Sequence, residues 1–226
     1  TIATNVGASV NWTPALTLAA QIPNATNGTC TITCQSYNGG TLTGTRTCTI
    51  TLNVPATVAP SISSVTVEDT VTTVASRIGA FVKSLSKLSV AITAAGTNGS
   101  TVSSYRTSLD GVTYTTASFT ASKKLSTAGN LTLTVTVTDS RGRTATYTET
   151  LTVLDYSYPS IRLFKADRCN ADGSAAQVDG THVRYSFEGG VVSLNNKNAL
   201  ACVVYYKLAS AETWTQAETL SVTSYN

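Results

Sequence analysis

The chain has 226 residues, of which 42% are hydrophobic and only 12% are charged. This composition is typical of a globular protein and excludes a disordered chain, which needs low hydrophobicity and high net charge. The formal net charge of +3 is too small to indicate a nucleic-acid or membrane-surface partner. Because no run of ~18 apolar residues occurs, we also expect no membrane insertion.

The first recognisable element is a hairpin. Two runs, residues 29–37 and 41–54, place apolar residues and cysteines at alternate positions with threonines between them, as strands with one buried face do. The sequence Asn38-Gly39-Gly40 between the runs fits a three-residue turn. Residues 1–57 contain too few strands for a complete β-sandwich, so we expect them to be the C-terminal part of one.

Five cysteines at irregular spacing do not form the pattern of a disulfide scaffold. They are Cys30, Cys34, Cys48, Cys169 and Cys202. On one strand Cys30 and Cys34 would lie ~13 Å apart, too far to share a metal ion, so we predict no metal site. Buried free thiols are the main interpretation. With the three-residue turn, Cys30 lies opposite Cys48, which leaves a cross-strand disulfide between them as an open alternative in an oxidising setting.

Two Pro-Ser-Ile sequences indicate an internal repeat. They begin at Pro60 and Pro159, 99 residues apart, and one immunoglobulin-like sandwich has ~100 residues. Residues 54–60 form a connector of small residues with two prolines, which is short enough to be semi-rigid. We therefore expect a complete immunoglobulin-like β-sandwich in residues 58–155.

Within this module the patterns predict strands at residues 61–67, 87–94, 102–109, 112–116, 131–138 and 144–154. The sequence Asp110-Gly111 indicates a two-residue hairpin turn, because both central residues of such a turn need positive φ. Residues 70–83 have helical spacing over only about two turns, and we interpret them as a loop with at most one helical turn.

The last two of these strands form the clearest hairpin in the chain, residues 130–154. Apolar residues alternate with threonines on both sides of a polar break, Ser140-Arg141-Gly142, which fits a three-residue loop. Gly142 supplies the left-handed conformation that such a loop requires. The resulting register pairs Asp139 with Arg143 and puts both apolar rows on one face.

Residues 156–226 begin a further module. We predict strands at residues 160–166, 182–188 and 201–208, with a loop rich in Gly and Asp over residues 170–180. The run VVYYKLASAETWTQ resembles the central strand, the turn and the Trp-bearing strand of fibronectin type III domains. Because about 70 residues are too few for a ~100-residue sandwich, we expect the N-terminal part of a fibronectin type III-like β-sandwich here.

The predicted fold class is therefore all-β, with tandem immunoglobulin-like/fibronectin type III-like β-sandwich modules of which the first and last are incomplete. The sequence contains no recognisable set of catalytic or ligand-binding residues. His182 is out of phase with the apolar row of its strand, as a solvated residue is, and does not indicate a Ser-His-Asp triad. Asp172 and Asp179 flank one loop but lack the ligand spacing of a calcium loop. We predict no enzyme activity, no metal and no cofactor.

Five segments together resemble one protein family. In chain order they are QIPNATNGTCTITCQSYNGGTLTGTRT, SKLSVAITAAGTNGSTVSSYRTSLDGVTY, VTVTDSRGRTATYTETLTVLDYSYPSI, RCNADGSA and VSLNNKNA. They are similar to an uncharacterised family of tail-associated structural proteins from siphophages of Gram-positive bacteria. The proteins of this family are built from tandem immunoglobulin-like and fibronectin-like domains. The resemblance implies a full-length protein that extends beyond both ends of this chain. It supplies no catalytic residues, because the family has none established.

The resemblance implies a virion protein of the phage tail, at its fibre or baseplate periphery. As an extended spacer and host-surface adhesion module, it would bind other virion tail proteins and host cell-wall glycans and would form a homo-oligomer in the virion. Two alternatives stay open: a bacterial cell-surface adhesin, and a non-catalytic glycan-binding appendage of a cell-wall-degrading enzyme.

Overall fold

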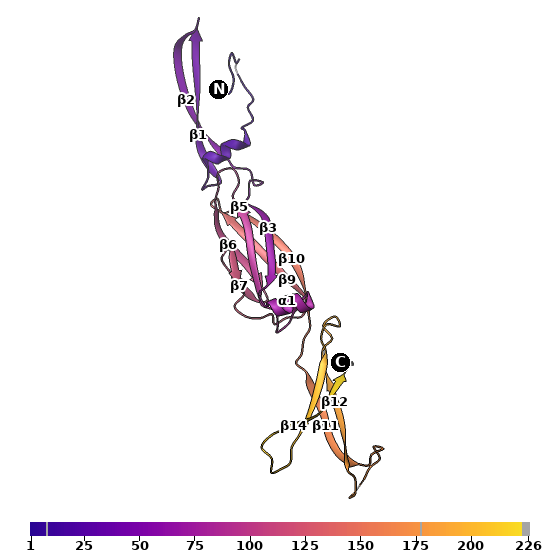
Figure 1. Ribbon diagram of the computed structural model, residues 1–226. Coiled ribbons are helices and arrows are strands. Elements are labelled where there is room, and N and C mark those ends of the chain that lie inside the picture. The colour runs from indigo at the N-terminus through magenta and orange to yellow at the C-terminus, as the bar shows by residue number, and fades with distance from the viewer. Residues whose placement is uncertain (8, 177, 223–226) are drawn as a thin grey trace. The chain divides into compact units, whose positions relative to one another are not determined.

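The computed structural model describes residues 1–7, 9–176 and 178–222, which form several β-sheets with little helix (Figure 1). The protein is all-β, as the sequence predicted. The first of two compact units contains residues 1–68, 88–122 and 132–151. The second contains residues 69–87, 123–131 and 152–226. The three modules expected from the sequence have other boundaries and stay a prediction.

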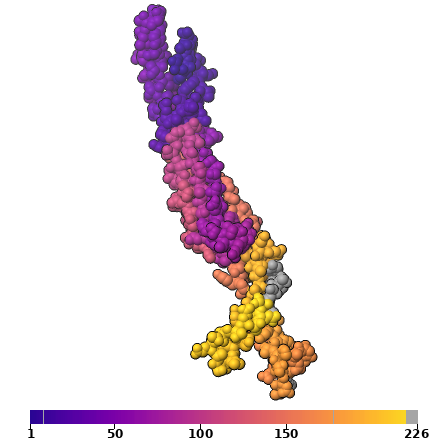
Figure 2. All heavy atoms as spheres, viewed as in Figure 1, coloured from indigo at the N-terminus to yellow at the C-terminus, as the bar shows by residue number. Residues whose placement is uncertain are grey.

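The first unit begins with a short 3-10 helix and a long hairpin. Helix η1 spans Leu16–Gln21, and the strands β1 (Asn27–Asn38) and β2 (Thr41–Asn53) pair antiparallel. Gly39 and Gly40 both have positive φ, 54° and 86°, and form a two-residue turn between the strands. Most residues of both strands are exposed to solvent, as Figure 2 shows for the face turned to the viewer.

The turn differs from the predicted three-residue loop, and the cysteine register differs with it. A two-residue turn moves the pairing by one residue, and a bulge directly before Tyr37 moves it by another. Cys30 therefore lies opposite Ile50, and Cys48 lies opposite Ile32. The predicted register of Cys30 opposite Cys48 is wrong, and both thiols are free in the structure.

Two sheets make up most of the rest of the first unit. Their strands are β3 (Ser61–Asp69), β5 (Leu88–Ala95), β6 (Val102–Leu109), β7 (Val112–Tyr114), β8 (Ser118–Thr120), β9 (Gly129–Asp139) and β10 (Thr144–Leu154). One sheet has the order β3-β5-β8, and the other contains the run β10-β9-β6-β7. Asp110 and Gly111, with φ of 47° and 74°, form the two-residue turn between β6 and β7. Strand β8 was not predicted, because three residues are too few for an alternating pattern.

The core of these sheets comes from alternate residues of the strands. On β9, Leu133, Val135 and Val137 are completely buried, whereas the threonines between them are exposed or half-buried. The buried rows on β5, β6 and β10 are made by Leu88, Val90, Ile92, Leu109, Leu151 and Val153. One face of each strand is thus apolar, and hydroxyl-bearing residues cover the outer faces.

The second unit contains the only α-helix among the described residues, α1 (Thr72–Ile78), followed by the strand β4 (Phe81–Val82), which pairs in parallel with the end of β10. Gly79 ends the helix in the left-handed conformation, with φ of 69°. The sequence predicted at most one helical turn, but the helix has seven residues. Val74 packs against Val82, and this burial stabilises a helix too short to form by itself.

Two further hairpins belong to the second unit. Strand β11 (Ser160–Cys169) pairs with β12 (His182–Gly190), and β13 (Leu200–Tyr206) pairs with β14 (Thr215–Val222). Each pair forms a separate two-stranded sheet. Large apolar side chains remain exposed in this region, among them Trp214 at 63%. The fibronectin type III-like arrangement expected here is not established by two separate hairpins and stays a prediction.

Candidate functional site

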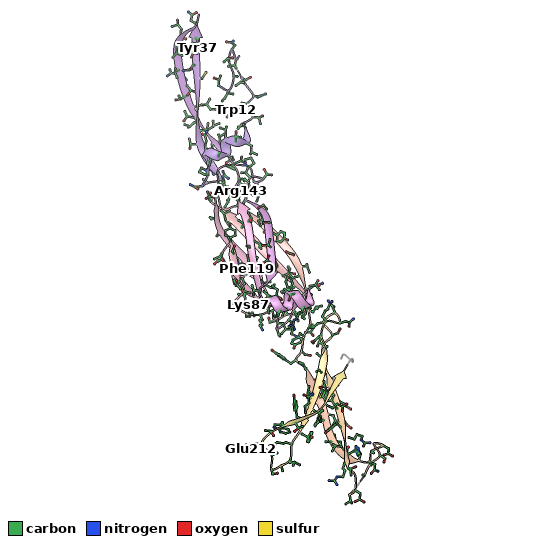
Figure 3. The ribbon with its side chains drawn as sticks, viewed as in Figure 1. Trp12, Tyr37, Lys87, Phe119, Arg143 and Glu212 are labelled. Atoms are coloured by element: carbon green, nitrogen blue, oxygen red, sulfur yellow. The ribbon has the colours of Figure 1, made fainter. Side chains whose placement is uncertain are left out.

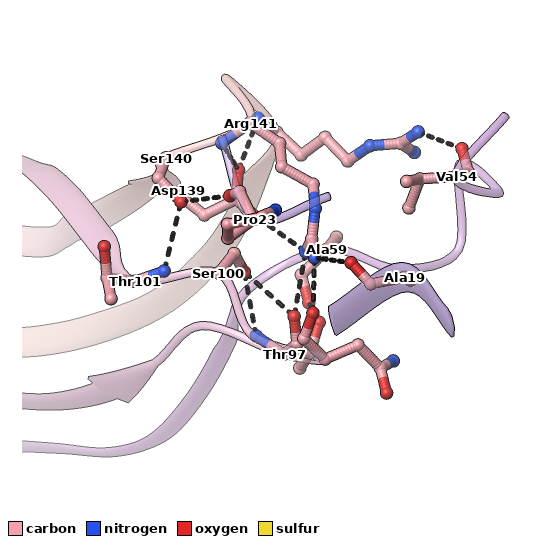
Figure 4. A network of polar contacts seen from close by, with 12 residues as sticks. Ala19, Pro23, Val54, Ala59, Thr97, Ser100, Thr101, Asp139, Ser140 and Arg141 are labelled. Atoms are coloured by element: carbon pink, nitrogen blue, oxygen red, sulfur yellow. Dashed lines mark hydrogen bonds and ion pairs between the residues drawn. The ribbon is translucent and has the colours of Figure 1, made fainter. Parts of the chain in front are cut away.

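The described residues contain no group of three or more His, Cys, Asp and Glu side chains placed to hold a metal ion. In the same part of the chain, no helix has the length and apolar character needed to cross a membrane. A dense network of polar contacts lies instead at the tip of the β9–β10 hairpin (Figure 4). This arginine junction consists of Asp139, Ser140, Arg141 and Arg143 with the main-chain groups that they contact.

Asp139 shapes the loop from inside, with a side chain that is completely buried. Its Oδ1 atom accepts hydrogen bonds from the backbone N–H groups of Arg141 (3.0 Å) and Arg143 (2.9 Å). The N–H of Asp139 donates to the backbone oxygen of Arg143 (2.8 Å), as the predicted pairing requires. Gly142 has the predicted positive φ, 79°, and its N–H donates to the backbone oxygen of Asp139 (2.9 Å). The loop is therefore held in one conformation.

The guanidinium group of Arg141 lies among main-chain oxygens and is also completely buried. Its Nε donates to the oxygen of Ile22 (2.8 Å), and its Nη1 donates to the oxygen of Thr97 (2.8 Å). Its Nη2 donates to the oxygens of Ala19 (2.8 Å) and Asn98. A charge is tolerated in the interior only when its donors are paired, and four carbonyl groups meet that requirement here.

Two of these four acceptors, the oxygens of Ala19 and Ile22, lie at the C-terminal end of helix η1. The carbonyl groups at a helix C-terminus carry the negative end of its dipole, so a guanidinium is a favourable partner there. The loop after β5 also presses on this helix. A Cβ atom added to Gly99 would lie 2.8 Å from both the Cα and the oxygen of Ala20, and Gly99 has φ of 84°. Glycine is therefore required for this close approach.

Ser140 and Arg143 extend the junction to neighbouring segments. The Oγ of Ser140 donates to the oxygen of Pro23 (2.6 Å) and accepts the N–H of Thr101 (3.1 Å). Arg143, labelled in Figure 3, donates from Nη2 to the oxygen of Val54 (2.5 Å). An apolar cluster is formed by Ala19, Val54 and Val58, with Ile22 packed against it. The hairpin tip thus binds the segments on both sides of the β1–β2 hairpin.

A second fixed contact lies within the second unit. Leu194, Asn195 and Asn196 form a leucine turn, in which all three residues have positive φ: 48°, 59° and 61°. This conformation is strained for leucine, because its Cβ atom approaches the following carbonyl oxygen. Leu194 is only 5% exposed and packs with Val74 of α1 and Val82 of β4. Burial of its side chain offsets the strain of its backbone.

Two further polar candidates from the sequence, Asp172 and His182, form local contacts of their own. The side chain of Asp172 accepts bonds from the hydroxyl (2.7 Å) and the N–H (2.9 Å) of Ser174, and these bonds lower the pKa of its carboxyl group. This is the bonding of an Asp in a turn. His182 is exposed on β12, with its Nδ1 atom 3.0 Å from the hydroxyl of Thr181.

Sequence reasoning missed the buried role of Arg141 and the strained leucine turn. It assigned Arg141 to a hairpin loop, where a charged side chain is normally solvated. The only local signal was the placement of two arginines beside Asp139 in a chain with 12% charged residues. The leucine turn has a weaker signal, since Asn accepts positive φ but Leu does not.

A family model described as "Siphovirus protein of unknown function (DUF859)" matches residues 1–182. This range contains the arginine junction and helix α1. The match confirms the resemblance to a siphophage family that the sequence indicated. Neither the search of curated proteins nor the search of solved structures found a match.

Proposed function

Because the chain belongs to this family of siphovirus proteins, we propose that it is a structural protein of the virion, located in the tail at its fibre or baseplate periphery. It acts there as an extended spacer and a host-surface adhesion module. Its partners in this role are other virion tail proteins and further copies of the same chain. The fold by itself is weak support, because one β-sandwich architecture hosts many functions.

The arginine junction is the observation that carries the proposal. A spacer maintains the separation of its ends only if its elements are joined by fixed contacts, because a flexible linker leaves them free to move. Three side chains of one hairpin tip, Ser140, Arg141 and Arg143, donate six hydrogen bonds to main-chain oxygens of other segments. Four of these bonds go to the segments directly before and after the β1–β2 hairpin and attach it to the sheets of the first unit without a free linker.

We further propose that residues 58–155 form an immunoglobulin-like sandwich. Short, mostly antiparallel strands in two sheets, each with alternating buried and exposed residues, support this assignment. A crystal structure of the whole chain tests it directly. Two facing sheets with Greek-key connections are expected, and two sheets that do not share a core would contradict the assignment.

Purified virions test the proposed role. We expect mass spectrometry to detect the protein in virions banded on a density gradient, and gold-labelled antibodies to mark the tail. A phage protein made only for DNA replication provides the control, since it must be missing from the same preparation. The proposal is wrong if the protein is abundant in infected cells but absent from virions.

Two other results would favour the alternative roles. Antibody labelling of uninfected bacteria would indicate a cell-surface adhesin. Release of soluble fragments from purified cell walls by the full-length protein would indicate the appendage of a cell-wall-degrading enzyme. Either result, together with absence from virions, replaces the proposed role.

A further inference from the structure

A shallow groove of about 520 Å³ crosses the outer face of the β3-β5-β8 sheet in the first unit. Its volume is within the range of roughly 300–1,000 Å³ that is usual for small-molecule sites. The outward-facing side chains that line it are those of Thr66, Glu68, Ser89, Ala91, Ser118 and Thr120. Four of these six carry a hydroxyl group and one carries a carboxylate.

The central strand β5 forms the floor of the groove. Its outward residues here, Ser89 and Ala91, are small. Strand β8 forms one wall, because Thr120 pairs with Ser89 and Ser118 pairs with Ala91. Small side chains between longer ones make the sheet surface concave along β5.

Strand β3 forms the opposite wall. The hydroxyl of Thr66 donates to the backbone oxygen of Ala91 (3.4 Å), and the hydroxyl of Ser89 donates to the backbone oxygen of Glu68 (3.5 Å). These contacts place Thr66 beside Ala91 and Glu68 beside Ser89. Neighbouring strands lie ~4.8 Å apart, so the two walls are ~10 Å apart. The groove is therefore an open channel with polar groups along both sides.

The groups in the groove are suited to a ligand rich in hydroxyl groups. A hydroxyl both donates and accepts hydrogen bonds, whereas a carboxylate only accepts them. Within the described part of the chain, the side chains of Glu68, Ser118 and Thr120 form no hydrogen bond or ion pair with other residues. A ligand can therefore bind them without breaking an existing contact.

The lining also excludes other ligand classes. It contains no Lys, Arg or His, so a phosphate or sulfate polymer would find no counter-charge. An acyl chain would cover the hydroxyl groups and the carboxylate of the lining without replacing their hydrogen bonds to water, which is unfavourable. The single carboxylate of Glu68 favours a ligand that is neutral or carries amino groups.

We propose that this groove binds a segment of a carbohydrate chain, neutral or bearing amino groups, with sugar hydroxyls bonded to Ser118 and Thr120. Glu68 accepts hydrogen bonds from a pair of hydroxyls or from an amino group of the sugar. This inference rests on the proposed adhesion function, because it names the surface and the ligand class through which the chain contacts a host cell wall.

Backbone NMR of the 226-residue chain tests the site with three probes: tetra-N-acetylchitotetraose, chitotetraose and tetragalacturonate. We expect the neutral and amino-sugar probes to shift amide signals of β3, β5 and β8, and the anionic probe to leave them unchanged. Shifts confined to other strands, or shifts with the anionic probe alone, would overturn the proposal. Absence of any shift with the first two probes would overturn it as well.

Three variants sharpen the test. Ala91→Leu fills the floor of the groove and is expected to weaken binding by about tenfold or more, whereas Thr148→Leu places the same side chain on the exposed face of β10 and should leave binding unchanged. Glu68→Gln should reduce affinity for chitotetraose more than for the acetylated probe. Equal effects of Ala91→Leu and Thr148→Leu would contradict the assignment.

Different experimental results would contradict the proposed carbohydrate site and the proposed virion function. If the protein is present in virions but Ala91→Leu changes neither probe binding nor adsorption to host cells, the groove is wrong and the spacer role stands. If the probes bind at the groove but the protein is absent from virions, the virion role is wrong and the carbohydrate site stands.

Discussion

Asp139 and Arg141 form an ion pair in which neither side chain is exposed to solvent, with Nη1 of Arg141 3.9 Å from Oδ2 of Asp139. Oδ2 accepts no hydrogen bond from the described residues, whereas Oδ1 accepts two backbone N–H groups. The two carboxylate oxygens therefore have separate roles. One shapes the hairpin loop, and the other compensates the buried positive charge.

Replacing Arg141 should destabilise the first unit strongly. Arg141→Ala removes four hydrogen bonds to main-chain oxygens and leaves the buried Asp139 carboxylate without its counter-charge, which we expect to lower the free energy of unfolding by ~3–5 kcal/mol. Arg141→Lys keeps the charge but supplies a single ammonium group, so its loss should be smaller. Chemical denaturation of the whole chain, with hydrogen exchange of residues 19–22, measures both effects.

Arg106→Ala is the matched control for these variants. Arg106 is exposed on β6, and its removal should change stability by no more than ~0.5 kcal/mol. If Arg141→Ala is no more destabilising than this control, the guanidinium does not hold the junction together.

Substitutions at two glycines distinguish the effect of close packing from the effect of backbone strain. Gly142→Ala places a Cβ atom in open space at φ of 79° and should cost only the strain of a left-handed residue, about 1–2 kcal/mol. Gly99→Ala adds the clash with Ala20 to a similar strain at φ of 84° and should cost more. Denaturation midpoints compare the two, and faster exchange at residues 19–22 should appear in Gly99→Ala alone. Equal midpoints would show that the loop after β5 can move away from η1.

The leucine turn predicts opposite effects at adjacent positions. Leu194→Ala removes a buried side chain, so we expect a loss of ~2–5 kcal/mol in the local stability of α1. Asn195→Gly replaces a residue at φ of 59° with one that adopts this conformation freely, so α1 should keep or increase its protection. Hydrogen exchange of residues 72–78 measures both variants. Unchanged exchange in Leu194→Ala would show that this side chain does not anchor the turn.

The hairpin register predicts the state of the cysteines. Because Cys30 lies opposite Ile50 rather than Cys48, we expect no bridge between the two cysteines. Denatured protein treated with iodoacetamide in the absence of reductant should gain five carbamidomethyl groups by mass spectrometry, one for each cysteine of the chain. A product with three groups that gains two more after reduction would indicate a disulfide and a different register.

The sequence predicted the strands of the first unit well, because alternation of Val, Leu and Thr reports directly which face of a strand is buried. The loop around Gly142 was equally predictable, since its length and its glycine specify one geometry. Helix α1 was underestimated because tertiary packing of Val74, which no local pattern reports, stabilises it. The turn at Gly39 was predicted wrongly because Gly-Gly fits both two- and three-residue loops.

The candidate site was less predictable than the strands. The hydrogen-bond acceptors of Arg141 are supplied by residues 19–22 and 97–98, which are far from it in sequence and contribute only backbone oxygens. A backbone oxygen is present at every position, so composition and spacing contain no trace of such a contact. The groove on β5 was hidden for a related reason: Ser89 and Ala91 are ordinary strand residues until their neighbours on β3 and β8 are known.

The nature of the acceptors of Arg141 affects which amino-acid substitutions the arginine junction tolerates. All four are backbone oxygens, so Arg141 recognises the path of the chain and is indifferent to the side chains at Ala19, Ile22, Thr97 and Asn98. Saturation mutagenesis should therefore find that the limits at Ala19 and Ile22 are set by their apolar cluster with Val54 and Val58 and not by the contact with Arg141. A different helix end with the same backbone course could be grafted onto this tip and still be held.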